Sequence, residues 1–370
     1  MKQIDSIIIG RGSAGMSAAL AAKKQGCESM LVLERSDALG GILQQCIHNG
    51  FGLQLFHEEL SGPAFAQRLI DALHQAQIPY RTKASVLSIT PDRIVTYVHP
   101  EDGLCRIRSK AIILASGCYE RTRGMISIGG KRIKGVYTAG SAQRYLNMEN
   151  ILVGRRVFIL GSGDIGLIMA RRMRLEGAEV LGVAELMPYS NGLTRNIVQC
   201  LEDFDIPLYL SHTVIDIQGD TRVEGITIAQ VDENKQPIPG SEKHFAADTL
   251  LLSVGLIPEE TLLQEAGVVL DPKTKGAKVN AHMETSIPHV YACGNALHVH
   301  DLVDDVCMEA RVAGASAIKD MEKKTEEACT EVIAEGEISY VVPQHITTHE
   351  KEDVIFSFRV KRPLHHALIT

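Results

Sequence analysis

A G-x-G-x-x-G pattern occurs twice in this chain, at residues 10–15 and 161–166. The first copy follows an apolar run at residues 4–9, which predicts a short buried strand, and precedes an Ala-rich segment that predicts a helix. A second predicted strand ends on Glu34, nineteen residues after Gly15. A strand, a glycine turn, a helix and a strand ending in an acid, in this order, indicate a dinucleotide-binding βαβ unit.

Each part of this unit has a physical task. Gly10 makes the tight turn, Gly12 lets a pyrophosphate approach the backbone, and Gly15 lets the helix pack on the strand. The helix N-terminus offers backbone N–H groups and the positive end of its dipole to the phosphates. We expect Glu34 to bind ribose hydroxyls. The predicted ligand contacts of the first unit are Gly10, Gly12, Ser13, Ala14, Gly15, Glu34 and Arg35.

The second pattern lies 151 residues downstream in the same setting of elements. An apolar strand precedes it, a helix follows, and the next strand ends on Glu185, nineteen residues after Gly166. Two copies with matched internal spacing predict two dinucleotide-binding domains. The predicted contacts of the second unit are Gly161, Gly163, Asp164, Ile165, Gly166 and Glu185.

Three later segments predict how the two domains are connected. Residues 110–121 and 248–259 each contain an apolar strand, ending in Ser116-Gly117 and Val254-Gly255, of the kind that returns to a sheet beside the nucleotide and crosses between domains. A strand before Gly294, followed by a helix at about 305–320, returns the chain to the first domain. We therefore expect an α/β fold of two nested Rossmann-like domains, the second inserted in the first, with a short β-rich C-terminal tail.

The expected boundaries follow from these segments. The first, discontinuous domain comprises residues 1–120 and 256–320, the inserted domain residues 121–255, and the C-terminal extension residues 321–370. The tail begins as a polar helical continuation or linker. Residues 338–346 and 353–360 then read as two strands of a hairpin.

This arrangement resembles the superfamily of pyridine nucleotide–disulfide oxidoreductases, the relatives of thioredoxin reductase, over about residues 4–320. The resemblance implies FAD in the first domain and NAD(H) in the second. Gly40 and Gly41 match the family's segment beside the pyrophosphate, Val86 the backbone contact to adenine, and Gly294-Asn295 the usual Gly-Asp pair. Further contacts implied in this way are Ala115, Ser116, Gly117, Gly255, Cys307 and Met308.

The cysteines depart from the disulfide reductases of that superfamily. All eight lie apart, with no C-x-x-C, so we expect free thiols and no redox disulfide. Residues 38–52, 115–124 and 292–306 look similar to electron-transfer subunits that accompany glycerol-3-phosphate-dehydrogenase-like flavoproteins in anaerobic bacteria. Opine oxidases and hydrogen cyanide synthase have related subunits.

Several single residues remain open between a chemical and a packing role. By the family geometry Cys46 and His48 lie near the flavin, where they would tune it or move a proton, or would simply be packed. His298 and His300 are expected near the same ring. Cys293 and Cys307 lie close to these histidines in sequence, but their spacing does not suit a tetrahedral site, so no metal is expected.

The resulting hypothesis is an FAD-dependent oxidoreductase in which NADH passes a hydride to the flavin. Because the sequence offers no second redox centre, a second redox subunit, either a flavoprotein or an iron–sulfur protein, is expected to exchange electrons with it; the chain is also a possible homo-oligomer. Two alternatives stay open: an amine or opine oxidase-like subunit, and a non-catalytic FAD-holding partner subunit.

Charge and hydropathy restrict the partners and the location. The formal net charge of −7 argues against nucleic acid. The N-terminal apolar run is too short for a signal peptide, and no stretch approaches the roughly 20 apolar residues of a membrane span. A cytoplasmic protein with no membrane span is therefore expected.

Overall fold

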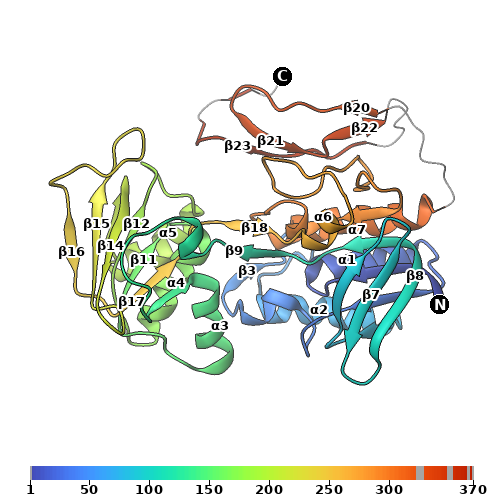
Figure 1. Ribbon diagram of the computed structural model, residues 1–370, viewed down its shortest axis with the longest axis horizontal. Helices are drawn as coiled ribbons and strands as arrows, with labels where there is room; N and C mark the ends of the chain where they lie inside the picture. Colours follow the sequence, from blue (N-terminus) through green and yellow to red (C-terminus); the bar gives the residue numbers. More distant parts are fainter. Residues whose placement is uncertain (1, 322–328, 348–352, 365–366, 369–370) are drawn as a thin grey trace. The chain divides into compact units, whose positions relative to one another are not determined.

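A computed structural model describes residues 2–321, 329–347, 353–364 and 367–368. The chain divides into two compact units: unit 1 is Met1–Cys118 with Ile257–Thr370, and unit 2 is Tyr119–Leu256. Strands β9 (Cys118–Glu120) and β18 (Leu256–Pro258) connect the units and pair with each other (Figure 1). Both units have helices packed on parallel sheets, which confirms the predicted α/β class.

Unit 1 is built on a sheet in the order β5-β2-β1-β8-β7-β6, with β19 also paired to β8. The strands are β1 (Lys2–Ile9), β2 (Met30–Leu33), β5 (Tyr80–Arg81), β6 (Ser85–Ile89), β7 (Ile94–His99), β8 (Gly103–Leu114) and β19 (Val290–Ala292). β1 runs parallel to β2 and β8, whereas β6 and β7 form an antiparallel extension of the sheet. The central strands consist mainly of apolar residues, as expected for strands that are buried on both faces.

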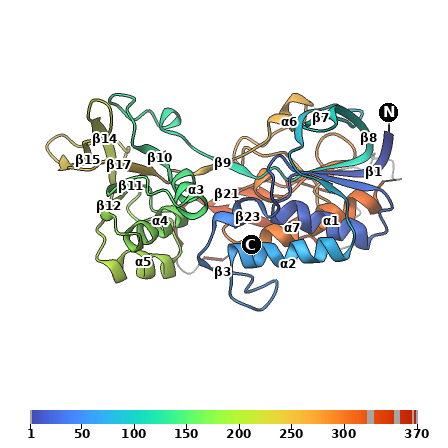
Figure 2. The ribbon, with the colours of Figure 1, turned by 90° about the horizontal axis from the view of Figure 1, so that it is seen from below.

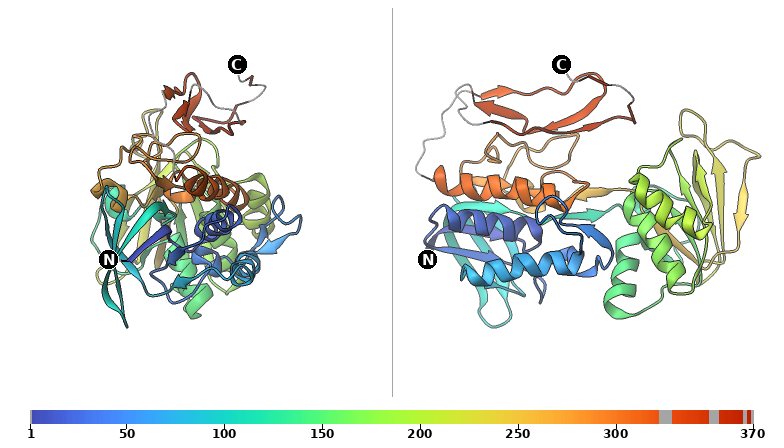
Figure 3. Two further views of the ribbon diagram at one scale, coloured as in Figure 1. Left: turned by 90° about the vertical axis from the view of Figure 1, so that its right-hand side faces the viewer. Right: turned by 180° about the vertical axis from the view of Figure 1, so that it is seen from behind.

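The main helices of unit 1 are α1 (Ser13–Lys24), α2 (Gly62–Gln75) and α7 (Val303–Lys319); α6 (Thr261–Glu265) is short. Helix α1 lies between α7 and α2 (Figures 2 and 3). Helices α1 and α7 approach closely at Gly314, since a Cβ on this residue would lie 2.1 Å from the Ala18 carbonyl oxygen. The small residues of α7 thus serve helix packing.

Unit 2 contains a parallel sheet in the order β10-β17-β11-β12-β13. Its strands are β10 (Val136–Thr138), β11 (Arg156–Leu160), β12 (Glu179–Glu185), β13 (Leu208–Leu210) and β17 (Thr249–Leu252). One face carries α3 (Ala139–Glu149), α4 (Asp164–Leu175) and α5 (Thr194–Cys200). The other carries the antiparallel sheet β14 (His212–Gln218), β15 (Gly225–Gln230) and β16 (Lys243–Phe245).

The alternation of side chains along β11 explains these two faces. Val157 and Ile159 pack in the core beneath the helices, whereas Phe158 and Leu160 pack in the core beneath β14–β16. All four side chains are apolar, as expected for a strand covered on both faces.

The two predicted crossover strands end two residues before the expected Ser116-Gly117 and Val254-Gly255. β8 ends at Leu114 and β17 at Leu252, several residues before β9 and β18 begin. Gly117 has a φ of +80° and Gly255 a φ of +107°, so the chain leaves the extended conformation at both glycines.

The tail contains two antiparallel pairs. β21 (Ile338–Val342) pairs with β23 (Ser357–Val360), which confirms the expected pairing, although residues 348–352 between them lie outside the described residues. β22 (His345–Thr347) pairs instead with β20 (Cys329–Glu331). The expectation of a helix or linker is therefore wrong at residues 329–331, where strand pairing decides the conformation.

The remaining short elements are η1 (Gly41–Gln45), β3 (Asn49–Phe51), β4 (Leu60–Ser61), η2 (Arg123–Met125), η3 (Glu202–Phe204) and η4 (Gly294–Ala296). Within the described residues, no helix combines the length and the apolar character that crossing a bilayer requires.

Candidate functional site

The first glycine loop is fixed by its own backbone. Gly10 has a φ of +101°, and a Cβ there would lie 2.2 Å from the Ala115 carbonyl oxygen. A Cβ on Gly15 would lie 1.9 Å from the Gly10 carbonyl oxygen. Gly12 differs because its φ is −74° and nothing lies within 4 Å of an added Cβ. The fold needs two of the three glycines, and the third faces open space.

Glu34, at the end of β2, holds the first glycine loop by hydrogen bonds to the backbone. Glu34 is 8% exposed. Its Oε2 accepts a 3.0 Å hydrogen bond from the Arg11 N–H, and its Oε1 accepts a 2.7 Å bond from the Ser36 N–H. The N-cap of α1 is Gly12, which supplies no side-chain cap, and the first turn of α1 contains no acid. Its terminal N–H groups are therefore suited to an anion.

The second glycine loop repeats this geometry. Gly161 has a φ of +99°, and a Cβ there would lie 2.0 Å from the Ser253 carbonyl oxygen. Glu185, 5% exposed, accepts a 2.9 Å hydrogen bond from the Ser162 N–H at Oε2 and a 3.0 Å bond from the Met187 N–H at Oε1. A Cβ on Gly163 would meet only the Ser253 Oγ, at 3.8 Å. The two loops correspond atom for atom in their backbone contacts.

The second loop carries one acid that the first lacks. Asp164 begins α4, and its Oδ1 accepts hydrogen bonds from the Leu193 N–H at 2.8 Å and the Asn196 Nδ2 at 2.6 Å. Ile165 is half-buried and Gly166 is buried. Asp164 thus fastens the segment after β12 to the start of α4. Its contact with a nucleotide stays a prediction.

Three predicted segments of unit 1 meet at the first loop. A Cβ on Gly41 would lie 3.0 Å from the Gly12 Cα, and the Gly40 N–H donates to the Arg11 carbonyl at 3.2 Å. Gly294 has a φ of +67°, and a Cβ there would lie 2.7 Å from the Ala14 Cβ. Segments far apart in sequence therefore line the same open space beside Gly12.

Other predicted contacts lie as follows. The Ala115 N–H donates to the Ile9 carbonyl at 2.8 Å, and the Ser116 Oγ donates to the Glu259 carbonyl at 2.7 Å. Val86 is half-buried in β6, and Arg35 is exposed. None of these placements by itself establishes a nucleotide contact.

Cys46 and His48 show no arrangement for nucleophilic chemistry. The Cys46 Sγ donates to the Ile42 carbonyl at 3.3 Å, and burial raises the pKa of the thiol to about 12. The His48 Nδ1 lies 3.0 Å from the Asn49 carbonyl oxygen, and its ring contacts that of Phe51 at 4.9 Å between centroids. The packing interpretation of Cys46 is favoured because the reactive form of cysteine is the thiolate.

The two predicted FAD contacts in α7, Cys307 and Met308, differ in burial. Cys307 is fully buried, its Sγ lies 3.9 Å from the Ser13 carbonyl oxygen, and burial raises its pKa to about 11. Its side chain therefore packs α7 on α1. Met308 is 42% exposed.

Sequence reasoning missed two acids of α7. Asp304, 3% exposed, accepts hydrogen bonds from the N–H groups of Gly52 (3.2 Å), Gln54 (3.1 Å) and Leu55 (2.8 Å), and so fastens that segment to the helix. The other is Glu309. Its signal in the sequence was an acid four residues before Ala313, on the small-residue face of the helix.

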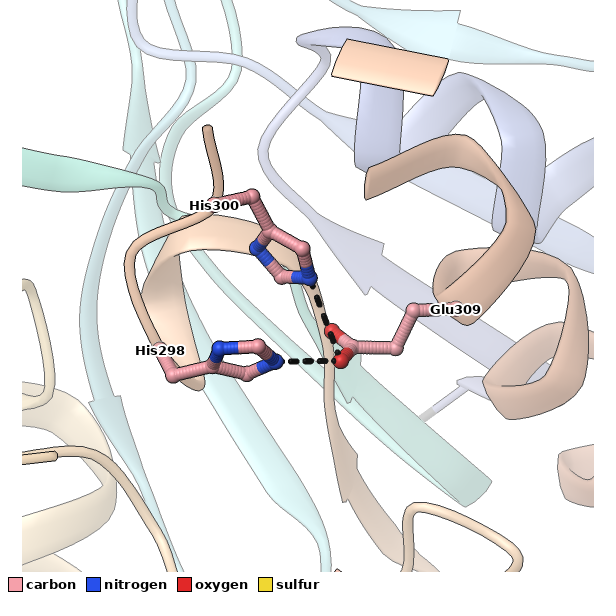
Figure 4. A group of neighbouring side chains, drawn as sticks. All are labelled: His298, His300 and Glu309. Atoms are coloured by element: carbon pink, nitrogen blue, oxygen red, sulfur yellow. Dashed lines mark hydrogen bonds and ion pairs between the residues drawn. The ribbon is translucent and has the colours of Figure 1, made fainter. Parts of the chain in front are cut away.

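Glu309 forms a buried cluster with His298 and His300 (Figure 4). The Glu309 Oε2 lies 2.8 Å from the His298 Nε2 and 3.3 Å from the His300 Nε2. Burial alone raises the pKa of Glu309, but the two imidazoles lower it overall, to about 2. Burial alone lowers the pKa of His300, but Glu309 raises it overall.

Comparison with known proteins places this geometry among redox enzymes. The chain is 25% identical over 315 residues to hydrogen cyanide synthase subunit HcnB of Pseudomonas protegens, covering 79% of this chain and 66% of that protein. It is 23% identical over 283 residues to one of the opine oxidase subunits of Agrobacterium tumefaciens, covering 72% of this chain and 55% of that protein. The chain thus spans less than two thirds of the length of either relative.

The fold also matches a solved structure. Thioredoxin reductase of T. acidophilum, 24% identical, aligns with a TM-score of 0.69 over 86% of this chain and 99% of that one. The model of the family named pyridine nucleotide-disulphide oxidoreductase matches residues 4–351. The chain therefore belongs to the pyridine nucleotide-disulphide oxidoreductase family, whose cofactors are FAD and a nicotinamide nucleotide.

Proposed function

We propose that this chain is an FAD-dependent NAD(H) oxidoreductase, with FAD in unit 1 and NADH in unit 2. The observation that carries the proposal is the pair of loops in which Glu34 and Glu185 accept the same two backbone hydrogen bonds. A carboxylate held at this place in a glycine loop is the part of a dinucleotide site that binds the ribose.

The residues of unit 1 fit FAD. The open space beside Gly12 meets an uncapped helix N-terminus, and Gly41 and Gly294 let their segments pack closely against Gly12 and Ala14. The residues that would hold FAD are Gly10, Gly12, Ser13, Ala14, Gly15, Glu34, Gly40, Gly41 and Gly294. Bound FAD supplies a centre that accepts a hydride from a nicotinamide and releases electrons. The chain binds and orients it.

Asn295 departs from the usual acid of the family and is engaged within the protein. Its Oδ1 accepts a 3.0 Å hydrogen bond from the His300 N–H, and its Nδ2 lies 3.6 Å from the Cys118 Sγ. The Asn295 side chain therefore orders the segment that follows Gly294. A contact with FAD from this residue would come through the remaining capacity of its amide.

The residues of unit 2 fit NADH better than NADPH. The Glu185 carboxylate accepts hydrogen bonds and carries no guanidinium or ammonium partner among the described residues. A 2′-phosphate would place like charge against it. The residues that follow, Leu186 to Tyr189, include no cation. Gly161, Gly163, Gly166 and Glu185 would hold the nucleotide.

A second redox subunit is the proposed electron partner. The relatives from hydrogen cyanide synthase and from opine oxidase are both named as subunits. The eight cysteines form no disulfide with one another and no close pair in sequence, so they offer no redox disulfide as a second redox centre. An association with a glycerol-3-phosphate-dehydrogenase-like protein, and a cytoplasmic location, stay predictions from the sequence.

The test uses two matched alanine variants of the full chain. Gly12→Ala and Gly163→Ala each add a methyl group where the fold leaves space. We expect Gly12→Ala to fold without FAD. Gly163→Ala should retain FAD, but anaerobic NADH should no longer bleach it. Gly124→Ala, whose Cβ would meet only the Thr122 Oγ1 at 3.8 Å, is the control.

The alternatives make different predictions in the same titration. Flavin that bleaches with an amino compound but not with NADH would replace the proposal by an amine or opine oxidase-like activity, in line with the relative from Agrobacterium. Flavin that neither NADH nor NADPH reduces would leave a non-catalytic FAD-holding subunit. A chain that binds no FAD would overturn all three.

A further inference from the structure

His298, His300 and Glu309 each direct one ligand atom to the same small volume of unit 1 (Figure 4). The three atoms lie within 4.8 Å of one another. The carboxylate oxygen is 2.8 Å from one imidazole nitrogen and 3.3 Å from the other. In an octahedral shell with bonds of about 2.1 Å, neighbouring ligand atoms are about 3.0 Å apart, so these separations match two edges of such a shell.

The contacts of His300 direct its Nε2 toward Glu309. The His300 backbone N–H donates to the Asn295 Oδ1 at 3.0 Å, which identifies that atom as the oxygen. The same oxygen lies 3.3 Å from the His300 Nδ1, so this ring nitrogen is the one that donates to Asn295. The His300 Nε2 is the other ring nitrogen, and it faces the Glu309 Oε2 at 3.3 Å without a hydrogen bond within the described residues.

The ligand atoms are also buried and held in place. The side chains of His298, His300 and Glu309 are 5%, 5% and 8% exposed. The second oxygen of Glu309 accepts a 2.7 Å hydrogen bond from the Gly294 N–H, which leaves Oε2 to face the imidazoles. Metal sites in proteins use such supporting hydrogen bonds to orient their ligands.

We propose that His298, His300 and Glu309 bind one divalent first-row transition-metal ion through two imidazole nitrogens and one carboxylate oxygen. This donor set suits Zn²⁺, Fe²⁺ or Mn²⁺ rather than Ca²⁺ or Mg²⁺, which prefer oxygen ligands. The sequence-based expectation of no metal considered the two cysteines nearby and not Glu309. Cys307 packs against α1, and Cys293 is fully buried in the core after β19.

The ion would join the segment after Gly294 to α7. Gly294 contacts the Ala14 position at the N-terminus of α1, so the metal site adjoins the open space beside Gly12. The experiment below counts bound metal, so its outcome is distinguishable from that of the proposed redox activity, although Glu309 is held by Gly294, a proposed FAD contact.

The test is metal binding by the full purified chain. After removal of metal by a chelator, the chain is titrated with Zn²⁺, Mn²⁺ and anaerobic Fe²⁺, with bound metal counted by mass spectrometry and affinity measured by calorimetry. We expect one ion per chain. His298→Ala and Glu309→Gln should weaken binding at least 100-fold, and Zn²⁺ should raise the melting temperature of the unmodified chain but not of these two variants.

His282→Ala is the control, because His282 also faces a carboxylate, Asp320 at 3.7 Å, but with no second imidazole in the group. It should retain one high-affinity ion. Folding of each variant is checked by its circular dichroism without metal, and Glu309→Gln preserves side-chain size. Absence of tight binding of all three ions, or equal affinity in the Glu309→Gln variant, would overturn the proposal and leave a metal-free imidazole–carboxylate cluster.

Discussion

Replacing Glu260 by glutamine should change how stability depends on pH. Glu260 precedes α6 and is 4% exposed, and neither of its carboxylate oxygens has a hydrogen-bond partner among the described residues. Burial raises the pKa of this carboxyl to about 9 from its ordinary value of 4.5, and the charge of Glu259 adds to the effect. The folded protein therefore holds a proton that the unfolded chain has lost at neutral pH.

The sign and the size follow from proton linkage. Between pH 4.5 and about 9 the folded state binds one more proton than the unfolded state, so the free energy of unfolding falls as pH rises. The slope is about 1.4 kcal/mol per pH unit, or ~2.7 kcal/mol from pH 6 to pH 8. At an unfolding entropy of about 2.1 cal/mol/K per residue, this corresponds to roughly 3–6 °C in melting temperature, depending on whether unit 1 or the whole chain unfolds together.

The assay compares melting temperatures of the unmodified chain and Glu260→Gln at pH 6, 7 and 8. Glutamine does not titrate, so any packing cost is the same at each pH. The variant should gain roughly 3–6 °C relative to the unmodified chain between pH 6 and pH 8. Glu265→Gln, exposed on the same helix, is the control and should run parallel to the unmodified chain. If the melting temperature of Glu260→Gln changes with pH as that of the unmodified chain does, the Glu260 carboxyl is ionised in the folded state.

Three further predictions concern other parts of the chain. The kcat/KM for NADH should exceed that for NADPH by at least ~10-fold, and Glu185→Gln should narrow this ratio because it removes the repelling charge; an unchanged ratio in steady-state kinetics would contradict this. Gly314→Ala should lower the free energy of unfolding by about 1–3 kcal/mol in urea denaturation, because its Cβ would lie 2.1 Å from the Ala18 carbonyl oxygen. Asp304→Asn should speed proteolytic cleavage near residues 52–55, since one amide oxygen replaces a carboxylate that accepts three backbone hydrogen bonds.

The sequence was most informative where local backbone geometry decides the structure. Gly10 and Gly161 occupy the left-handed region that their turns require, and the spacing to Glu34 and Glu185 places each acid beside its loop. The composition of residues 329–331 favoured a helix or a linker, but pairing with β22 makes them a strand. Such a contact comes from the tertiary fold and leaves no periodic trace in the sequence.

The cluster of His298, His300 and Glu309 also depends on tertiary contacts that the sequence does not reveal. His298 and His300 were noticed because two histidines stand close together in the chain. Their acid partner lies on the following helix, and only the packing of α7 on η4 brings it to 2.8 Å from the His298 Nε2. The cysteines close to these histidines in sequence, Cys293 and Cys307, take no part in the cluster.

The two glycine loops have the same backbone contacts but differ in the charge beside the acid that is proposed to bind ribose. After the first glycine, unit 1 has Arg11, whose guanidinium lies 3.3 Å from the centre of the Tyr80 ring and whose backbone N–H binds Glu34. Burial lowers the pKa of Arg11 to about 10, so the side chain remains a cation at neutral pH and offsets the charge of Glu34. Unit 2 has Ser162 at this position, which donates a neutral hydrogen bond of 2.7 Å to Glu185. Glu34 thus has a cation close by, whereas Glu185 has only a hydroxyl donor. Repulsion of a 2′-phosphate is accordingly expected at the second loop, the proposed site of the nicotinamide nucleotide.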